Sequence, residues 1–232
     1  MKVVYKMTAL ITGASSGIGM EITRILVKCG IKVIIIGRNL EKLELLRNEI
    51  GKKKCIAFTA DLSNKDECYN LYEKVKKYDI DILINNAGFG IFGRFVDTNL
   101  EKELDMINVN CTALHILTKL FLNDFINKDK GYILNVASSA GFMAGPMMSV
   151  YYATKNYVVR LTEAINEELR VSGSSVYIGA FCPGPVYTDF NNRAGIKSSS
   201  TKGINADYAA KYAIYNMFKR KMLIIPTLHM KL

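Results

Sequence analysis

Short apolar runs alternate with longer amphipathic segments along most of the chain. The apolar runs are rich in Val and Ile and have the length of buried strands; they cover residues 7–12, 32–37, 55–60, 81–85, 132–137, 175–182 and 222–225. The intervening segments have helical periodicity and cover residues 17–29, 40–50, 65–77, 100–127, 151–171 and 205–220. Strands that are apolar on both faces and separated by helices predict a parallel sheet covered on both sides.

This pattern predicts the fold class: an α/β protein with a doubly wound, seven-stranded parallel sheet, which is a Rossmann fold. The 232 residues fit a single domain, in which residues 1–130 form the cofactor half and residues 131–232 the catalytic and substrate half. Ligands of such sheets bind outside the carboxyl ends of the strands. We therefore expect the site among the residues that follow the strands.

One stretch, residues 189–205, resembles a linker because it contains the polar run Lys-Ser-Ser-Ser-Thr-Lys-Gly. An ordinary surface loop explains this composition. A mobile lid is the second interpretation, because the stretch follows the carboxyl end of a strand, where the ligand is expected. The two interpretations are compatible.

Composition excludes several classes of protein. Half of the residues are apolar, which suffices for a sizeable core, yet purely apolar stretches such as residues 33–36 are far too short to span a membrane. No signal peptide is visible. The five cysteines have no metal-type spacing and the two histidines lie far apart, so we expect a reduced, cytoplasmic protein without a metal site.

The net charge of +10 raises the question of nucleic-acid binding. The lysine clusters at residues 52–54, 76–77 and 219–221 each lie beside an expected helix end, where lysine is ordinary because it complements the helix dipole. No basic run is interleaved with aromatic residues, so we expect a solvated surface and no nucleic-acid partner. A general attraction for phosphorylated ligands is consistent with the charge.

A glycine-rich loop follows the first predicted strand. It reads Thr-Gly-Ala-Ser-Ser-Gly-Ile-Gly over residues 12–19. Glycines permit a tight turn there, and the start of the next helix offers free N–H groups to a pyrophosphate. The loop alone is a weak signal, because a simple strand-to-helix turn can have the same residues.

Tyr151 and Lys155 lie four residues apart in a predicted helix and would share one face. A nearby ammonium favours the phenolate, so Lys155 is expected to lower the pKa of Tyr151. Ser138, earlier in the chain, could supply a hydroxyl beside the phenol. Ordinary explanations exist for each: Tyr152 could be the exposed tyrosine instead, and Ser138 could be a turn residue.

Six motifs, in their order along the chain, resemble the signature of the short-chain dehydrogenase/reductase family. They are the glycine loop at residues 12–19, Asn-Asn-Ala-Gly at residues 85–88, Asn110, Ser138, the pair Tyr151 and Lys155, and Pro183-Gly184 followed by Thr188. The resemblance covers about residues 7–190. It implies an oxidoreductase that transfers a hydride between a nicotinamide cofactor and a carbonyl or alcohol carbon.

The resemblance also implies roles for individual residues. Tyr151 exchanges the proton, Ser138 holds the substrate oxygen, Lys155 binds the nicotinamide ribose, and Asn110 connects Lys155 to solvent. Asn110 could otherwise be a polar residue that merely interrupts a helix. The implied cofactor contacts, beyond Tyr151 and Lys155, are Gly13, Ser15, Ser16, Gly17, Ile18, Gly19, Asp61, Leu62, Asn86, Ala87, Gly88, Pro183, Gly184, Val186 and Thr188.

The end of the second predicted strand bears on the choice of cofactor. NAD sites usually place a carboxylate there to hold the ribose hydroxyls, but this chain has Arg38 and Asn39. A guanidinium suits a 2′-phosphate, although an arginine at a strand end is also a common surface residue. The missing carboxylate favours NADP(H), with Arg38 and Asn39 as further cofactor contacts.

The resulting hypothesis is an NADP(H)-dependent reductase of a small carbonyl substrate, with Tyr151 as general acid. A catalytically weak protein of the same fold that senses NADP(H) is the alternative. Family resemblance assigns helices 100–127 and 151–171 to subunit contact, so we expect a homodimer, with a homotetramer as the alternative. Apolar, adaptable residues near the motifs are candidates for the substrate pocket: Phe89, Phe92, Phe142, Met143, Met147, Met148 and Tyr187.

Overall fold

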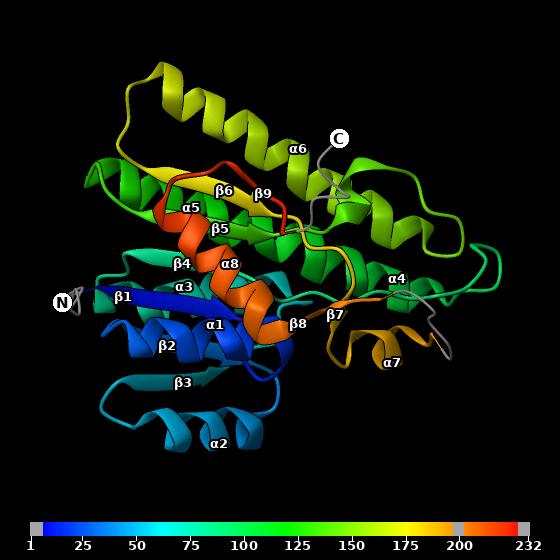
Figure 1. Cartoon of the computed structure of the whole chain (residues 1–232), viewed down its shortest axis with the longest axis horizontal. Helices are drawn as coiled ribbons and strands as arrows, with labels where there is room; N and C mark the ends of the chain where they lie inside the picture. The colour runs from blue at the N-terminus through cyan, green and yellow to red at the C-terminus, as the bar shows by residue number, and fades with distance from the viewer. Residues whose placement is uncertain (1–6, 197–201, 227–232) are drawn as a thin grey trace.

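Seven parallel strands form one sheet between two layers of helices (Figure 1). The computed structural model describes residues 7–196 and 202–226. The strand order is β3-β2-β1-β4-β5-β6-β9, so the winding changes direction between β1 and β4, and the predicted doubly wound Rossmann fold is confirmed. The strands are β1 (Thr8–Thr12), β2 (Lys32–Gly37), β3 (Cys55–Thr59), β4 (Ile82–Asn85), β5 (Tyr132–Val136), β6 (Tyr177–Phe181) and β9 (Leu223–Ile224).

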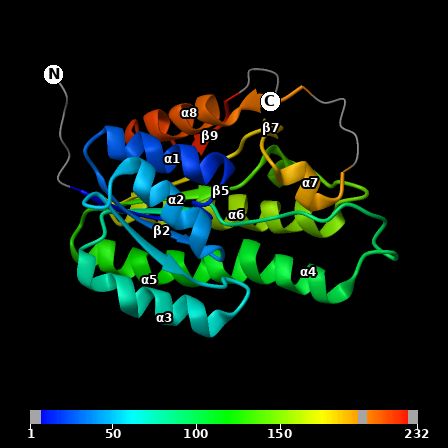
Figure 2. The ribbon, with the colours of Figure 1, turned by 90° about the horizontal axis from the view of Figure 1, so that it is seen from below.

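Helices cover both faces of the sheet (Figure 2). One face is packed by α1 (Gly17–Lys28), α2 (Leu40–Ile50) and α8 (Ala206–Phe218). The opposite face is packed by α3 (Lys65–Val75), α5 (Leu114–Asn127) and α6 (Ser149–Val171). Short 3-10 turns follow α3 and β5, at Lys76–Tyr78 and Ser139–Phe142.

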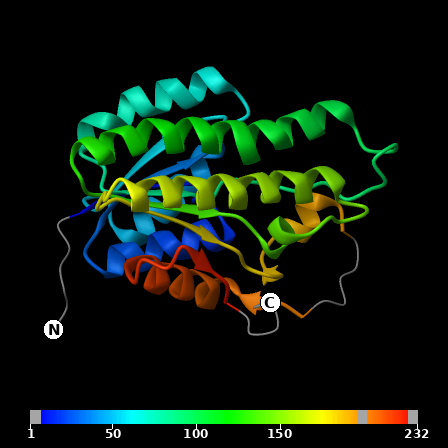
Figure 3. The ribbon, with the colours of Figure 1, turned by 90° about the horizontal axis from the view of Figure 1, so that it is seen from above.

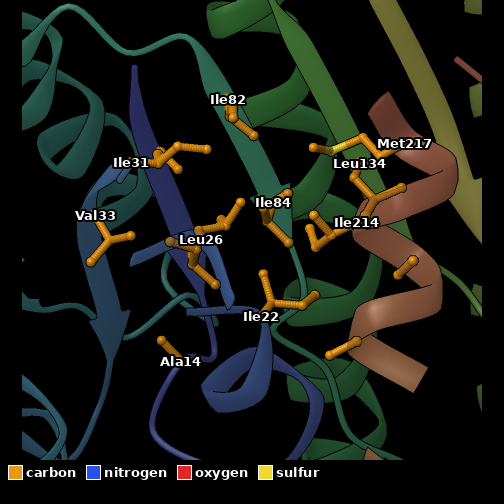
Figure 4. Close-up of a cluster of buried hydrophobic side chains, with 14 of the residues drawn as sticks. Ala14, Ile22, Leu26, Ile31, Val33, Ile82, Ile84, Leu134, Ile214 and Met217 are labelled. Carbon is orange, nitrogen blue, oxygen red and sulfur yellow. The ribbon is translucent and has the colours of Figure 1, made fainter. Parts of the chain in front are cut away.

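The strands are apolar on both faces because side chains alternate between two buried cores. In β1, Ala9 and Ile11 join the core beneath α1 and α8, whereas Leu10 joins the core beneath α3 and α5. Figure 4 shows the first core, with Ile22 of α1 and Ile214 of α8 converging on the sheet. All these side chains are almost fully buried, which explains why the strands appear as continuous apolar runs in the sequence.

The helix predicted over residues 100–127 is interrupted in the middle. The structure has α4 (Leu100–Ile107), a π-helical segment (Asn108–Ala113), and then α5. The interruption centres on Asn110, which is 1% exposed and uses its amide to bind other elements. Asn110 therefore does lie where the helix is interrupted, as one interpretation of the sequence predicted. Its side chain also connects this segment to other elements.

The second half of the chain also contains a small two-stranded sheet that was not predicted from the sequence. Strands β7 (Val186–Tyr187) and β8 (Ile204–Asn205) pair in parallel beside the main sheet. Between them, within the predicted lid, lies helix α7 (Phe190–Ala194). Residues 197–201 lie outside the described residues, so the motion expected of the segment 189–205 stays a prediction.

The described part of the chain shows no helix long and apolar enough to cross a membrane. Within residues 7–196 and 202–226, no group of three or more His, Cys, Asp or Glu side chains could hold a metal ion. All five cysteines are free thiols in this structure.

Candidate active site

A cleft of about 670 Å³ opens where the strands of the main sheet end. Its lining includes every predicted cofactor residue except Gly19, and every predicted catalytic residue except Asn110. The two exceptions lie behind the wall of the cleft and hold that wall in place. Residues from five of the six motifs thus line one cavity, and the sixth motif, Asn110, lies behind its wall.

The glycine loop is packed against the residues that follow β4. Gly13 has φ +64, and a Cβ added to it would lie 2.9 Å from Cα of Ala87. At Gly19 an added Cβ would lie 2.4 Å from Nδ2 of Asn86. Asn86 uses this nitrogen to donate hydrogen bonds to the carbonyls of Thr12 (3.0 Å) and Gly13 (3.1 Å). Both glycines are required by close packing, and Gly19 serves the loop rather than the cleft.

The start of α1 is suited to an anion. Ser16 occupies the N-cap position but its side chain makes no capping hydrogen bond, and the first turn of α1 contains no acidic residue. The first N–H groups of this helix therefore have no side-chain partner of their own, and the helix dipole favours negative charge at this end. A dinucleotide's pyrophosphate fits this loop on chemical grounds.

Arg38 and Asn39 follow β2 at the edge of the cleft. The side chain of Asn39 caps α2 by accepting the N–H of Lys42 at 2.8 Å. Arg38 is exposed and makes no hydrogen bond or ion pair with any residue that the structure describes. Asp61 follows the neighbouring strand β3, and its carboxylate accepts hydrogen bonds from the backbone N–H and the hydroxyl of Ser63 (3.0 and 2.9 Å).

Asn110 joins three parts of the site from its buried position on the π-helical segment. Its Oδ1 accepts the N–H of Phe89 at 3.1 Å, and its Nδ2 donates to the Phe89 carbonyl and the Thr154 hydroxyl, both at 3.0 Å. The Thr154 hydroxyl in turn donates to the carbonyl of Tyr151 at 2.7 Å. Asn110 therefore fixes the loop after β4 to the helix that carries Tyr151.

Tyr151 and Lys155 lie on one face of α6, as predicted, and both line the cleft. Nζ of Lys155 lies 5.8 Å from the centroid of the Tyr151 ring. It donates a 2.9 Å hydrogen bond to the carbonyl of Val136. The ammonium is thus held near the phenol by a backbone anchor on β5.

The expected lowering of the pKa of Tyr151 by Lys155 was wrong for this structure. Burial raises the pKa of Tyr151 to about 12, and a hydrogen bond with Ser138 acts in the opposite direction. Burial also lowers the pKa of Lys155 to about 8. Both shifts have one cause: taking either group out of water disfavours its charged form.

Ser138 lies beside Tyr151 at the end of β5. Its hydroxyl accepts the N–H of Ala140 at 3.2 Å, so the residue is indeed part of a turn, but its side chain also bonds to Tyr151. Tyr152 also reaches the cleft, and its ring packs edge-on against that of Tyr151, with centroids 6.1 Å apart. Tyr152 is the more exposed of the two tyrosines, because Tyr151 is buried, but the hydrogen bond with Ser138 is made by Tyr151.

Comparison with known proteins decides the family. A family profile described as short chain dehydrogenase matches residues 7–198. The chain belongs to the short-chain dehydrogenase/reductase family. Members of this family are oxidoreductases that use a nicotinamide cofactor, and the cleft described above has the residues to hold one.

Individual members of the family are similar over most of this chain. A Rickettsia typhi 3-oxoacyl-acyl-carrier-protein reductase, FabG, is 36% identical over 82% of this chain and 77% of its own length. A short-chain dehydrogenase from Sphingobium yanoikuyae, solved in complex with NADPH, is 32% identical, with a TM-score of 0.90, over 96% of this chain and 89% of its own. A family member from Burkholderia phymatum in complex with NAD is 22% identical, with a TM-score of 0.87, over 97% and 90%; at that identity it shows the fold alone.

The part of the cleft around Tyr151 is lined by apolar side chains. Of the seven candidate residues, only Phe89 and Met148 line it. The other five are exposed elsewhere and do not line it: Phe92, Phe142, Met143, Met147 and Tyr187. Proximity in sequence to a motif is therefore a poor guide to the pocket.

Several residues that line the cleft were not predicted from the sequence, and three of them bear on its chemistry. Phe190 of α7 packs against Tyr151, with ring centroids 5.3 Å apart. Lys42 of α2 and Arg193 of α7 add positive charge to the lining. Lys42 could have been found, because it lies one helical turn after Arg38, but nothing in the sequence indicates which face of the lid segment turns inward.

Proposed function

We propose that this family member is an NADP(H)-dependent oxidoreductase that reduces the carbonyl group of a small-molecule substrate. The observation that carries the proposal is the buried phenol of Tyr151, with Ser138 and Lys155 beside it, at the apolar end of the cleft. Asn110, Ser138, Tyr151 and Lys155 are the proposed catalytic set. The other predicted cleft residues are the proposed cofactor ligands, with Gly19 packing behind them.

The ionisation of the buried pair supports reduction. A phenol with a pKa of about 12 is protonated at neutral pH and can donate that proton to the oxygen of a carbonyl as negative charge develops there. Ser138 donates a second hydrogen bond to the same oxygen and fixes its orientation. Lys155, with a pKa of about 8, is mostly an ammonium at pH 7 and stabilises the phenolate that remains. When bound, the nicotinamide supplies the hydride.

Arg38 supports NADP(H) over NAD(H). It lines the cleft, is exposed, and has no carboxylate partner among the described residues, so it is available to a 2′-phosphate. The Sphingobium relative solved with NADPH agrees with this choice. The NAD complex of the more distant structure does not weigh against it, because that likeness is one of fold.

The first substrate to test is a 3-oxoacyl thioester, because the Rickettsia relative is named for that reaction. Phe89, Met148 and Phe190 surround Tyr151 with apolar groups, which suits an acyl chain or another apolar ketone. The test is NADPH oxidation with a panel of 3-oxoacyl thioesters, ketones and aldehydes. We expect turnover of at least one carbonyl; tight NADPH binding without any turnover would favour the alternative of an NADP(H)-sensing protein.

We also propose a homodimer in the cytoplasm, with a homotetramer as the second assembly to consider. Helices α4 and α6 lie next to one another (Figure 3), and leave large apolar side chains exposed at Leu104, Ile107 and Tyr157. An apolar surface of this kind is typical of subunit contacts. Light scattering on the purified protein gives the mass directly, and a monomer at micromolar concentration would refute the dimer.

A further inference from the structure

Arg193 reaches the glycine loop from the other end of the chain. Its Nη2 donates a 3.1 Å hydrogen bond to the hydroxyl of Ser16, 177 residues earlier. Both residues line the cleft. A contact between such distant segments brings a guanidinium to the helix end that is suited to an anion.

A second contact shows that the two segments are packed together at this point. A Cβ added to Gly17, the first residue of α1, would lie 3.1 Å from Cγ2 of Thr188, just before α7. The segment that leads into the helix of Arg193 therefore lies close to the start of α1.

The guanidinium is balanced at present by a carboxylate of its own helix. Nε of Arg193 lies 2.9 Å from Oδ2 of Asp189, and the side chains are 48% and 54% exposed. An ion pair this exposed is weak. A doubly charged diphosphate can therefore share or replace Asp189 as the partner of Arg193, at little cost to the fold.

We propose that Arg193 is a further cofactor ligand, which binds the diphosphate of the nicotinamide cofactor together with Ser16 and the first turn of α1. The proposal rests on the proposed use of the cleft as the cofactor site, but not on the choice of NADP(H), because NAD(H) and NADP(H) share the diphosphate. Arg193 and Arg38 then serve different phosphates. Arg193 serves the diphosphate at the start of α1, and Arg38 serves the 2′-phosphate at the end of β2.

Fragments of the cofactor separate these two roles. Adenosine 2′-monophosphate contains the 2′-phosphate but no diphosphate, whereas NAD⁺ contains the diphosphate but no 2′-phosphate. Dissociation constants are measured by calorimetry for NADP⁺, NAD⁺ and adenosine 2′-monophosphate with the wild type, Arg193→Ala and a control, Arg170→Ala. Arg170 is an exposed arginine in an ion pair with Glu167 on α6, so the control removes a matched charge away from the cleft.

We expect Arg193→Ala to weaken NADP⁺ and NAD⁺ binding about tenfold, as for loss of one partly exposed charge-assisted hydrogen bond. Binding of adenosine 2′-monophosphate should stay within about twofold of wild type, and Arg170→Ala should leave all three unchanged. Equal weakening of all three ligands would show a general charge effect and overturn the assignment. Unchanged NADP⁺ binding would overturn it as well.

The substitution Asp189→Asn provides an independent test, because it should change the affinity for NADP⁺ in the opposite direction to Arg193→Ala. Removing the carboxylate frees Arg193 and takes a negative charge from the cleft, so NADP⁺ should bind severalfold more tightly. Weaker binding would contradict the proposal. Failure of the proposed cofactor preference is distinguishable, because a protein that binds NAD⁺ alone would still lose affinity on Arg193→Ala.

Discussion

Two regions of the cleft use charged and ionisable groups in opposite ways. At the phosphate rim, which we define as Arg38, Lys42 and Arg193, the cations are exposed and lie at the edge of the pocket. At the proton corner, which we define as Asn110, Ser138, Tyr151 and Lys155, Tyr151 and Lys155 are only 8% and 5% exposed. In the corner, burial raises the pKa of Tyr151 and lowers the pKa of Lys155.

The difference shows what each environment allows. An exposed cation keeps its hydration, contributes little to stability, and can bind a mobile phosphate when one arrives. A buried phenol or ammonium loses hydration and is held by neighbours, which sets its protonation state but costs stability. Changes at the rim should therefore alter affinity, whereas changes in the corner should alter turnover and stability.

The largest effect is expected in the corner, from Tyr151→Phe. Removing the hydroxyl removes the proton donor while keeping the ring that packs against Phe190. Turnover of any carbonyl substrate should fall by about a thousandfold or more, within the range typical of lost general acid catalysis. Steady-state assays of NADPH oxidation measure this, with Tyr152→Phe as the matched control that should retain most activity. Substantial activity in Tyr151→Phe would remove Tyr151 from its role.

A rim change, Arg38→Asp, should give the next largest effect. It replaces a cation suited to a 2′-phosphate with a carboxylate suited to ribose hydroxyls. The ratio of kcat/KM for NADPH to that for NADH should fall about a hundredfold. Lys32→Asp is the control, because Lys32 is exposed at the other end of the same strand. An unchanged ratio in Arg38→Asp, or a wild type that prefers NADH, would refute the NADP(H) proposal.

Asn110→Ala should weaken the fold itself. The substitution leaves the N–H and carbonyl of Phe89 and the hydroxyl of Thr154 without their partner. Each unsatisfied buried group costs about 1–3 kcal/mol, and relaxation recovers part of the sum, so the free energy of unfolding should drop by about 2 kcal/mol. Urea unfolding of the wild type and the variant measures this loss of stability. Asn127→Ala, at the exposed end of α5, should change stability far less, and equal losses would contradict the account.

Lys155→Met should have the smallest effect, which is a change in stability that depends on pH. The pKa of Lys155 in the folded state, about 8, lies below its ordinary value of 10.5. Between these values the folded protein binds fewer protons than the unfolded chain, so wild-type stability rises with pH relative to the variant. Removing the buried ammonium should make the variant more stable than the wild type at pH 7. The net gain in the free energy of unfolding should be about 1 kcal/mol, because loss of the hydrogen bond to Val136 offsets part of it.

Thermal unfolding of both proteins at pH 7, 8, 9 and 10 tests the sign. The advantage of Lys155→Met should shrink as the pH rises through this window. A variant that is less stable at pH 7, or an advantage that grows with pH, would show that burial does not disfavour the charged form of Lys155.

The sequence predicts part of the cleft and misses part of it. The glycine loop, Asn86 and the Tyr151–Lys155 pair belong to short contiguous motifs at the ends of strands and helices, and all were found from sequence. The contact of Arg193 with Ser16 joins residues 177 positions apart, so no local pattern indicates it. The raised pKa of Tyr151 depends on burial by other elements, which spacing alone does not reveal.

The interruption of the helix at Asn110 illustrates the same limit. An asparagine inside a predicted helix indicates that the helix can be interrupted there. The π-helical geometry, however, depends on the partners Phe89 and Thr154, which lie in other elements. Local propensity thus predicts the elements and the motifs, while tertiary contacts decide how the motifs are joined.

The most direct test of the division between rim and corner is a titration of NADPH into Tyr151→Phe and Arg38→Ala side by side, followed by nucleotide fluorescence. We predict that Tyr151→Phe binds NADPH within about twofold of wild type, whereas Arg38→Ala binds it about tenfold more weakly. Equal weakening in both variants, or weaker binding in Tyr151→Phe than in Arg38→Ala, would contradict the account.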